Sequence, residues 1–308
     1  MTDAAPRVSV IVNCYNGEKY LRETLDSLFA QRMADFEVIF WDNASTDRSA
    51  DIAKRGDARL RYFRAPATTA LGEARNRAVA MARGEFLAFL DTDDRWYPDT
   101  LDTLVGAMTE GTALVYAGIR RIDEEGRPLG TFRPAPAAGM LLDSLLRQFD
   151  VWIQALLVRR KALLDAGLTF DPAVTASEEY CLFVQLAAEA PIRAIPDIVV
   201  DYRIHSSALT NRSVDKWADE RFYTLERLLS RHPEIRQRHA AALREAYARG
   251  HYYRARHFMT TGQPALARQE LKRTVGAGRM YLALYLLALL PPSAWRAVHT
   301  WKTKRAIG

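Results

Sequence analysis

Three carboxylates crowd the end of a short apolar segment, and they are the strongest chemical signal in the chain. The apolar residues 86–90 are followed directly by Asp91, Thr92, Asp93 and Asp94. Without a cation, such neighbours repel one another and at least one should have a raised pKa. Mg²⁺ and Mn²⁺ bind one or two carboxylates and complete their shells with phosphate oxygens and water. Asp91 and Asp93 therefore predict a site for Mg²⁺ or Mn²⁺ with a phosphate-bearing ligand. The alternative is a solvated acidic turn before a helix.

The elements that must position these carboxylates alternate between two periodicities. Continuous apolar, β-branched runs predict buried strands at 8–13, 36–43, 60–64 and 85–91. Apolar residues at helical spacing predict helices at 17–31, at 44–55 with Ser and Thr caps, and at 71–84 closed by Gly84. This alternation predicts a mostly parallel sheet with right-handed crossovers.

Two further polar clusters follow predicted strands. They are Asn13-Cys14-Tyr15-Asn16 and Asp42-Asn43. Because the carboxyl ends of parallel strands meet at one edge, where ligands of such sheets bind, we expect all three clusters to share that edge.

The later part of the chain is less regular. We expect strands at 113–123, 151–160 and 198–205, a turn at 124–130, and a loop over the site at 132–140. A short helix should end at Gly167, and a second helix should cover 177–190 with Ser177 as its N-cap. From residue 211 onward the pattern is helical only.

Charge distribution and cysteine content limit the classes of protein to which this chain can belong. Residues 1–210 hold 24 Lys and Arg against 30 Asp and Glu, whereas residues 211–308 hold 19 against 7. An acidic N-terminal part and a basic C-terminal part suggest two functions, or one function and one segment that directs the protein to its location. Cys14 and Cys181 lie in apolar surroundings and are expected to be buried, reduced thiols of a cytoplasmic protein. No secretory signal or membrane-spanning run is expected.

Three segments, in order, resemble the signatures of family 2 glycosyltransferases of the GT-A fold. They are VSVIVNCYNGEKYLRETLDSLFAQ, EVIFWDNASTD and GEARNRAVAMARGEFLAFLDTDD, and the resemblance runs from residue 7 to about residue 210. It implies an α/β catalytic domain over 1–210, with a Rossmann-like sheet flanked by helices, followed by the all-helical region 211–308. It also implies inverting transfer of a hexosyl group from a nucleotide-diphosphate sugar to an acceptor hydroxyl, assisted by Mg²⁺ or Mn²⁺.

The resemblance assigns roles to individual residues. Asp42 matches the acid that binds the nucleotide base, with Asn43 where the family usually has a second acid. Asp91 matches the carboxylate near ribose and metal, and Asp93 matches the metal ligand. The nucleotide-sugar-binding residues implied in this way are Asn13, Tyr15, Asn16, Asp42, Arg75, Asn76 and Asp91.

The catalytic base of the family is an acid in a motif that usually ends in Glu-Asp. The segment SEEYCLF has Glu178 and Glu179, so Glu179 occupies the place of the usual Asp and reaches one methylene further. Either Glu could take the acceptor proton, a role worth roughly 10²–10⁴ in rate. Alternatively, both are simply acids favoured in a first helical turn.

The segment YRIHSSALT, 202–210, resembles a family segment that places a His after the last strand. It implies that His205 contacts the metal or the diphosphate, as neutral imidazole is a common ligand. Arg203 could compensate phosphate charge or be a surface arginine. Trp96 either stacks on a sugar or nucleotide, or is a buried or lid tryptophan.

The basic C-terminal part has its own alternatives. The apolar run 280–290 has 11 residues and ends at Pro291, too short to span a bilayer as a helix. Apolar residues with Trp295, Trp301 and basic neighbours suit a helix on an anionic membrane surface. The alternative is a helix packed on the catalytic domain with a solvated basic end. No nucleic-acid motif is present, so we expect no nucleic-acid partner.

The resemblance implies an enzyme of surface polysaccharide, lipopolysaccharide or glycoconjugate synthesis. A UDP-sugar is the expected donor, and the acceptor is a saccharide, a lipid-linked sugar or a protein. We expect a cytoplasmic location, with peripheral attachment to the inner face of the membrane as a further expectation. Two rivals remain: another metal-dependent phosphoryl-transfer enzyme, and a non-catalytic nucleotide-sugar-binding or scaffold protein.

Overall fold

The structure is a computed structural model of the 308-residue chain, and it describes residues 5–54, 57–205, 215–291 and Trp295. It divides into two compact units. The first comprises Met1–Leu141 and Asp150–His205, and the second comprises Leu142–Phe149 and Ser206–Gly308. The expected boundary near residue 210 lies outside the described residues.

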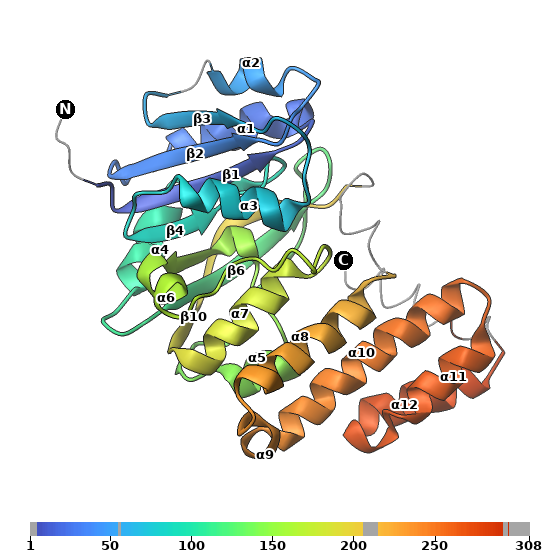
Figure 1. Cartoon of the computed structure of the whole chain (residues 1–308). Coiled ribbons are helices and arrows are strands. Elements are labelled where there is room, and N and C mark those ends of the chain that lie inside the picture. The colour runs from blue at the N-terminus through green and yellow to red at the C-terminus, as the bar shows by residue number, and fades with distance from the viewer. Residues whose placement is uncertain (1–4, 55–56, 206–214, 292–294, 296–308) are drawn as a thin grey trace. The chain divides into compact units, whose positions relative to one another are not determined.

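The described part of the first unit contains a ten-stranded sheet (Figure 1). Its strand order is β3-β2-β1-β4-β9-β6-β10-β5, with β7 paired to β6 and β8 paired to β10. The strands are β1 Val8–Cys14, β2 Phe36–Asp42, β3 Leu60–Arg64, β4 Phe86–Phe89, β5 Arg95–Trp96, β6 Leu114–Ile122, β7 Pro128–Phe132, β8 Ala137–Gly139, β9 Leu156–Arg159 and β10 Ile192–Arg203.

Strands β1, β2, β3, β4, β6 and β10 all run in one direction. Parallel pairing joins β1 to β2 and β4, β2 to β3, and β6 to β10, while β9 lies antiparallel between β4 and β6. The prediction of a mostly parallel α/β sheet is therefore confirmed. The strands against this direction are β5, β7, β8 and β9.

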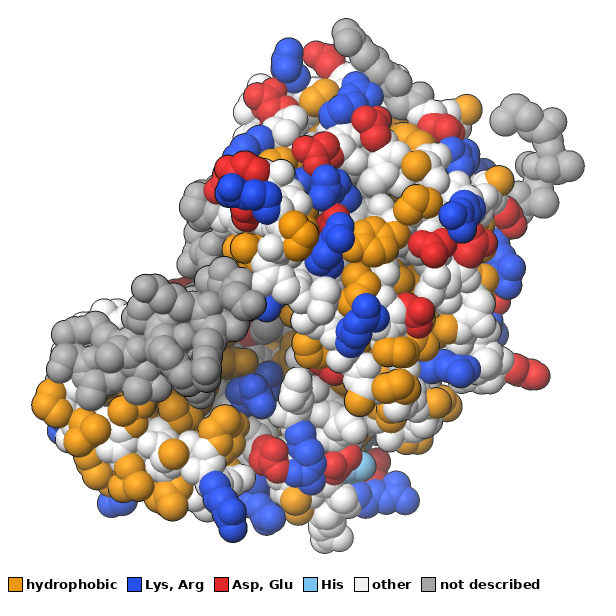
Figure 2. All heavy atoms as spheres, turned by 180° about the vertical axis from the view of Figure 1, so that it is seen from behind, with side chains coloured by type: hydrophobic (Ala, Val, Ile, Leu, Met, Phe, Trp, Pro, Cys, Tyr) orange, Lys and Arg blue, Asp and Glu red, His pale blue; other side chains and the backbone are white. Residues whose placement is uncertain are grey.

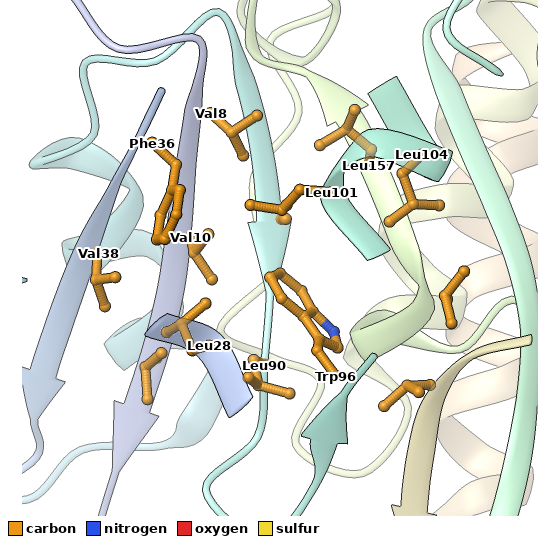
Figure 3. Close-up of a cluster of buried hydrophobic side chains, with 14 of the residues drawn as sticks. Val8, Val10, Leu28, Phe36, Val38, Leu90, Trp96, Leu101, Leu104 and Leu157 are labelled. Carbon is orange, nitrogen blue, oxygen red and sulfur yellow. The ribbon is translucent and has the colours of Figure 1, made fainter. Parts of the chain in front are cut away.

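Helices cover both faces of this sheet. Those described in the first unit are α1 Glu18–Phe29, α2 Ser49–Lys54, α3 Leu71–Ala80, α4 Thr100–Ala107, α6 Arg160–Asp165 and α7 Glu178–Glu189, with the 3₁₀ turn η1 Ile153–Ala155. The apolar stripe of α1 meets alternate residues of β1 and β2, together with Leu101 and Leu104 of α4 (Figure 3). Helix α3 packs on β1 and β2 and lies in front of the sheet in Figure 1.

Two predicted helix ends are wrong. Helix α2 begins at Ser49 rather than after Ser45 and Thr46, because both of these residues contact Asn16 instead. Helix α3 ends at Ala80, so Gly84 does not close it. A Cβ atom at Gly84 would lie 2.5 Å from the backbone nitrogen of Ser9. Glycine is present there because two backbones approach closely.

Segments 124–140 and 151–160 also differ from expectation. The predicted turn and loop contain β7 and β8, which pair antiparallel with β6 and β10. Pro, Ala and Gly rarely occur in strands, so the sequence pattern missed them, but backbone pairing does not require large side chains. In 151–160 the strand starts only at Leu156, after the 3₁₀ turn η1.

The second unit is helical throughout its described residues, as predicted for the C-terminal region. Its elements are α5 Leu142–Arg147, α8 Trp217–Arg231, α9 Ile235–Arg238, α10 Ala240–Thr260, α11 Pro264–Lys272, η3 Val275–Ala277 and α12 Arg279–Leu289. Within the described residues, no helix is both long and apolar enough to cross a membrane. Trp295 is 3% exposed in the core of this unit, so the membrane-surface alternative does not hold for this side chain. Trp301 lies outside the described residues.

Candidate active site

The three polar clusters meet at one edge of the sheet, as their positions after parallel strands predicted. Cys14 pairs in register with Asp42, and the backbone N–H of Asn43 donates to the carbonyl of Cys14 at 2.8 Å. A Cβ atom at Gly17 would lie 2.9 Å from Oγ1 of Thr92 and 3.1 Å from Sγ of Cys14. The turn after β1 is therefore packed directly against the Asp-Thr-Asp turn after β4.

Arg75 connects the candidate donor-binding carboxylate to the candidate base. Its side chain is 3% exposed; Nη1 donates to Oε1 of Glu179 at 2.7 Å, and Nη2 to Oδ1 of Asp91 at 3.4 Å. Asp91 and Glu179 keep 36% and 24% of their side-chain surface exposed. A buried cation of α3 thus joins the end of β4 to the start of α7, and both carboxylates still reach solvent.

The pKa values of Asp91 and Asp94 are raised, mainly by desolvation, and the crowding that the sequence predicted adds to the shift. Partial desolvation raises the pKa of Asp91 to about 6; Arg75 opposes this shift, whereas Asp93 and Glu179 add to it. Burial, with Asp93 and Asp91 as neighbours, raises the pKa of Asp94 well above its usual value. A bound cation would relieve this repulsion.

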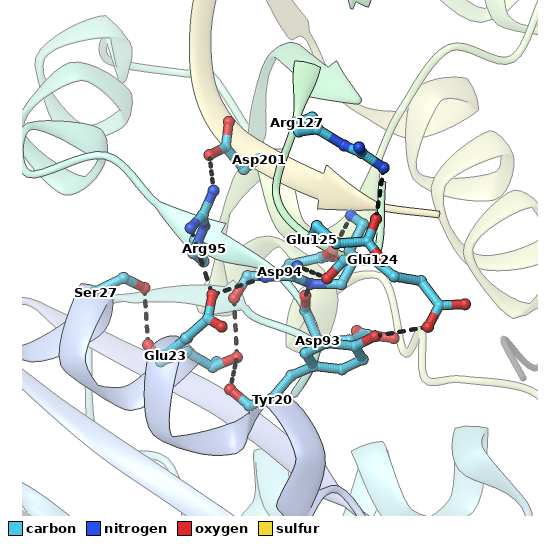
Figure 4. Close-up of polar contacts among 12 residues, drawn as sticks. Tyr20, Glu23, Ser27, Asp93, Asp94, Arg95, Glu124, Glu125, Arg127 and Asp201 are labelled. Atoms are coloured by element: carbon cyan, nitrogen blue, oxygen red, sulfur yellow. Dashed lines mark hydrogen bonds and ion pairs between the residues drawn. The ribbon is translucent and has the colours of Figure 1, made fainter. Parts of the chain in front are cut away.

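Arg203, at the end of β10, holds the carboxylate turn. Figure 4 labels the residues around it, among them Glu23, Asp93, Asp94 and Glu124. The Arg203 guanidinium is 1% exposed and donates to the Asp93 carbonyl at 2.9 Å, the Glu124 carbonyl at 2.8 Å and Oε2 of Glu23 at 2.8 Å. Its backbone N–H donates to Oδ1 of Asp94 at 2.8 Å. The side chain is therefore committed to protein groups, and the surface alternative considered for Arg203 is wrong.

His205 lies beside the expected metal ligand. Its Nε2 is 2.8 Å from Oδ2 of Asp93, and the two side chains are 9% and 31% exposed. Among the described residues, no group of three or more His, Cys, Asp or Glu side chains could hold a metal ion by itself. The partly exposed oxygens of Asp91 and Asp93 nevertheless fit an Mg²⁺ or Mn²⁺ ion that takes its other ligands from phosphate and water.

Asp42, the predicted base-binding acid, is fully buried. Its carboxylate accepts hydrogen bonds from the Tyr62 hydroxyl, from Nη1 of Arg64 at 2.7 Å and from the Ser45 N–H at 2.7 Å. Burial works to raise its pKa, but the hydrogen bonds from Tyr62 and Ser45 lower it overall. Arg64 and Tyr62 were missed by sequence reasoning, although β3 ends at the same edge and a basic residue there was a usable signal.

The other predicted nucleotide-side residues differ in their surroundings. Tyr15 is 55% exposed, and Asn16 has a left-handed φ of 53°. Nδ2 of Asn13 is buried and has no hydrogen-bond partner among the described residues. Asn76 uses its amide on the backbone of Phe170, with contacts of 2.8 and 3.0 Å, and so holds the segment before α7.

The two candidate bases differ in their exposure to solvent, and Trp96 is buried. Glu178 is 3% exposed and lies against Gly72, so Glu179 is the more accessible carboxylate. Trp96 is 3% exposed and donates from Nε1 to the Gln154 carbonyl at 2.8 Å. It is a core tryptophan, and the stacking alternative is wrong.

Comparison with known families gives the assignment. Residues 9–163, half of the chain, match the family model described as glycosyl transferase family 2. The chain belongs to glycosyltransferase family 2. This family differs from the phosphoryl-transfer enzymes considered as a rival.

Curated relatives in this family include the putative teichuronic acid biosynthesis glycosyltransferase TuaG of Bacillus subtilis. It is 26% identical over 222 residues, which cover 70% of this chain and 85% of TuaG. An uncharacterized glycosyltransferase of Rickettsia felis is 28% identical over 210 residues, covering 65% of this chain. The match spans only 35% of that relative's own length.

Two solved structures share the fold. S. aureus TarS 1–349 in complex with UDP-GlcNAc superposes with a TM-score of 0.67 at 21% identity, covering 88% of this chain and 81% of TarS. Mannosyltransferase PcManGT from Pyrobaculum calidifontis, in complex with GDP-Man and Mn²⁺, gives a TM-score of 0.58 at 20% identity, covering 99% and 85%. The first unit therefore has the GT-A fold, as expected.

Proposed function

We propose that this chain is an inverting glycosyltransferase that moves a hexosyl group from a nucleotide-diphosphate sugar to an acceptor hydroxyl. The observation that carries the proposal is the Arg75 bridge, with Asp91 and Glu179 on its two guanidinium nitrogens. It connects a candidate donor-side carboxylate and a candidate base at the carboxyl edge of the sheet, where ligands of such folds bind. Residues 1–210 are the proposed catalytic domain.

The proposed donor is a UDP-sugar. The likeness to TarS, solved with UDP-GlcNAc, supports it. We assign donor contact to Asn13 near the end of β1 and to Tyr15 and Asn16 on the turn after it, with Asp42 beneath them. Arg75 and Asn76 would support this site from within, because their polar groups already bind protein atoms.

The proposed cofactor is Mg²⁺ or Mn²⁺, and the Mn²⁺ in PcManGT supports it. Asp93 and Asp91 would hold the ion, with His205 beside Asp93 at 2.8 Å. When bound, the ion would neutralise the negative charge that develops on the diphosphate leaving group.

Glu179 is the proposed general base. Its carboxylate would take the proton of the acceptor hydroxyl as the acceptor oxygen bonds to the anomeric carbon and the bond to the diphosphate breaks. Arg75 holds Oε1 of Glu179, which leaves Oε2 for the acceptor hydroxyl. Attack on the face opposite the diphosphate inverts the anomeric configuration.

The proposed setting is the synthesis of a surface polysaccharide, lipopolysaccharide or glycoconjugate, which the likeness to TuaG supports. The acceptor would be a saccharide, a lipid-linked sugar or a protein. We place the chain in the cytoplasm, peripheral to the inner face of the membrane.

Release of free nucleoside diphosphate tests the proposal. UDP-, GDP- and dTDP-sugars would be incubated with Mn²⁺ or with EDTA, using wild type, Asp93→Asn and Glu179→Gln. The matched controls are Asp99→Asn, at an exposed aspartate, and Glu125→Gln, whose side chain is 66% exposed. Metal-dependent release from one donor, lost in the two site variants and kept in the controls, would support the transferase. Donor binding without turnover, even with membrane extract as acceptor, would favour the non-catalytic binding protein.

A further inference from the structure

The outer face of α12 exposes an unusual amount of apolar surface. Five residues in and next to this helix are between 41% and 53% exposed: Met280, Leu282, Leu286, Leu289 and Leu290. Figure 2 shows apolar side chains gathered on this part of the second unit, at the lower left of the view. Contiguous apolar surface of this kind commonly marks a binding site rather than ordinary exposure.

The inner face of α12 already has its partners. Tyr281, Leu284 and Ala288 are buried in a core that also contains Leu271 and Trp295. The outward residues 282, 286 and 289 follow the spacing of a single helix face. A helix that is apolar on both faces is normally buried on both. The inner face packs in the core of the second unit, and the outer face is therefore suited to contact another apolar environment.

The surface around this face is cationic. The described residues 264–291 contain four Lys and Arg and one acid, Glu270. Glu270 is 7% exposed and is held by His251 and Arg273. Lys272, Arg273 and Arg279 are exposed at the end where α12 begins. Within the described residues 264–291, positive charge at the surface is thus not balanced by an exposed acid.

We propose that the outer face of α12 docks on the surface of an anionic phospholipid bilayer, with the helix lying in the plane of the interface. Leucines would enter the boundary between headgroups and acyl chains, and the basic residues would meet lipid phosphates. At 11 residues, α12 is too short to span the bilayer. The inference rests on this surface alone and does not depend on the transferase activity.

Charge favours a bilayer over two other possible partners of this face, a second copy of the chain and the chain's own C-terminal residues. In a symmetric dimer the same patch meets itself, so the basic residues of one copy would face those of the other. The chain's own residues 296–308 contain four Lys and Arg and no acid, so they would add like charge. Anionic lipid supplies both the apolar phase and the opposite charge.

Co-sedimentation of the full chain with vesicles tests the proposal. Vesicles would contain phosphatidylcholine alone, or phosphatidylcholine with phosphatidylglycerol. We expect binding to the anionic vesicles that weakens with added salt. Leu286→Glu should weaken it roughly tenfold or more, because a leucine leaves the apolar phase and an acid approaches lipid phosphate.

Leu164→Glu is the matched control, since Leu164 is 64% exposed on α6 of the first unit. It should bind vesicles like wild type, and both variants should release nucleoside diphosphate like wild type in the absence of lipid. Failure of wild type to bind anionic vesicles, or equal binding by Leu286→Glu, would overturn the proposal. A dimer in sedimentation velocity that Leu286→Glu dissociates, without vesicle binding, would assign the face to a second copy.

Discussion

At the scale of single residues, Arg75 is the most informative side chain of the site. A buried guanidinium requires compensating charge, and here Asp91 and Glu179 provide it from two different elements. The planar fork can donate to two carboxylates at fixed angles, which a lysine ammonium on a flexible stem does not reproduce. Arg75 is thus placed to set the orientation of the proposed base.

Arg75→Lys should keep the charge and lose this geometry. We expect kcat to fall by on the order of 10²-fold, with a smaller change in KM, because a displaced catalytic group costs about that much. Steady-state kinetics, with the donor that the nucleoside diphosphate release assay identifies, would measure this fall in kcat. Arg77→Lys is the control, since Arg77 lies on the same helix in a surface ion pair with Glu73. An unchanged kcat would show that Arg75 does not position Glu179.

Arg203 gives a second prediction at this scale. Because its side chain fixes the carbonyl of Asp93, Arg203→Lys should let the carboxylate turn move. Loss of a supporting contact behind a metal ligand typically weakens metal binding by ~10–100-fold. Titration of Mn²⁺ in the presence of UDP, followed by electron paramagnetic resonance, would measure the change. Arg193→Lys on the same strand should bind Mn²⁺ like wild type; equal weakening in both variants would argue against a specific role.

At the scale of elements, the chain depends on a few close approaches between backbones. Gly84 lies where the segment after α3 crosses β1, and a Cβ atom there would meet backbone atoms of Val8 and Ser9 at 2.8 and 2.5 Å. A backbone cannot rotate away as a side chain can, so the strain would be spread through β1 and β4.

Gly84→Ala should therefore destabilise the fold by ~1–3 kcal/mol, the usual cost of overpacking. Urea denaturation would give the change in the free energy of unfolding. Gly106→Ala is the control, because Gly106 lies in α4 with no atom within 4 Å of the added Cβ. Alanine should be neutral or stabilising by up to ~1 kcal/mol at this helical position. Equal effects at the two glycines would contradict the explanation.

Glu37 joins several elements of the sheet and predicts a dependence of stability on pH. Its carboxylate accepts from the Ser9 hydroxyl at 2.7 Å, Arg61 Nη1 at 2.7 Å and the Arg83 N–H at 2.8 Å. Burial works to raise its pKa, but Arg61, Arg83 and Ser9 together lower it below the ordinary value of 4.5. The ionised form therefore stabilises the fold above that pH, and this stabilisation is lost as pH falls through the lowered pKa.

Glu37→Gln should consequently destabilise the fold most near pH 7. The difference from wild type should shrink as the pH falls below the ordinary value of 4.5. Urea denaturation of both proteins at several pH values would show it. A difference that stays constant across this range would mean that the ion pair contributes nothing beyond its hydrogen bonds.

At the scale of the whole molecule, the division into two units separates chemistry from the C-terminal helices. Every described residue that we assign to the site lies in the first unit. Leu271 is fully buried in the core of the second unit. Leu271→Ala should destabilise that unit by roughly 2–5 kcal/mol, the cost of a core cavity. Affinity for the donor nucleotide, measured by calorimetry, should stay unchanged at temperatures where both units are folded.

Leu266→Ala on the same helix is the control, because Leu266 is 39% exposed and should have little effect on unfolding. Loss of nucleotide affinity in Leu271→Ala, at a temperature where the first unit remains folded, would show that the second unit contributes to the site.

The element pattern was largely predictable from sequence, and the supporting contacts of the site were not. The strands at 8–14, 36–42 and 60–64 and the helix α1 followed from local periodicity. The Asp91–Asp93 pair and Glu179 were found by motif. The segments 128–132 and 137–139 were missed, because their pairing with β6 and β10 is decided by distant backbone and not by their own residues.

The sequence alone determined that parallel strands end in polar clusters at one edge, because alternation of strand and helix with right-handed crossovers permits little else. Only the tertiary structure decided which polar side chains face that edge and which are buried beneath it in contacts with protein groups. Asn76 holds Phe170, Arg203 holds the carboxylate turn, and Trp96 lies in the core. The physical reason is that burial and hydrogen bonding depend on partners 58 to 110 residues away in the chain, which no local pattern records.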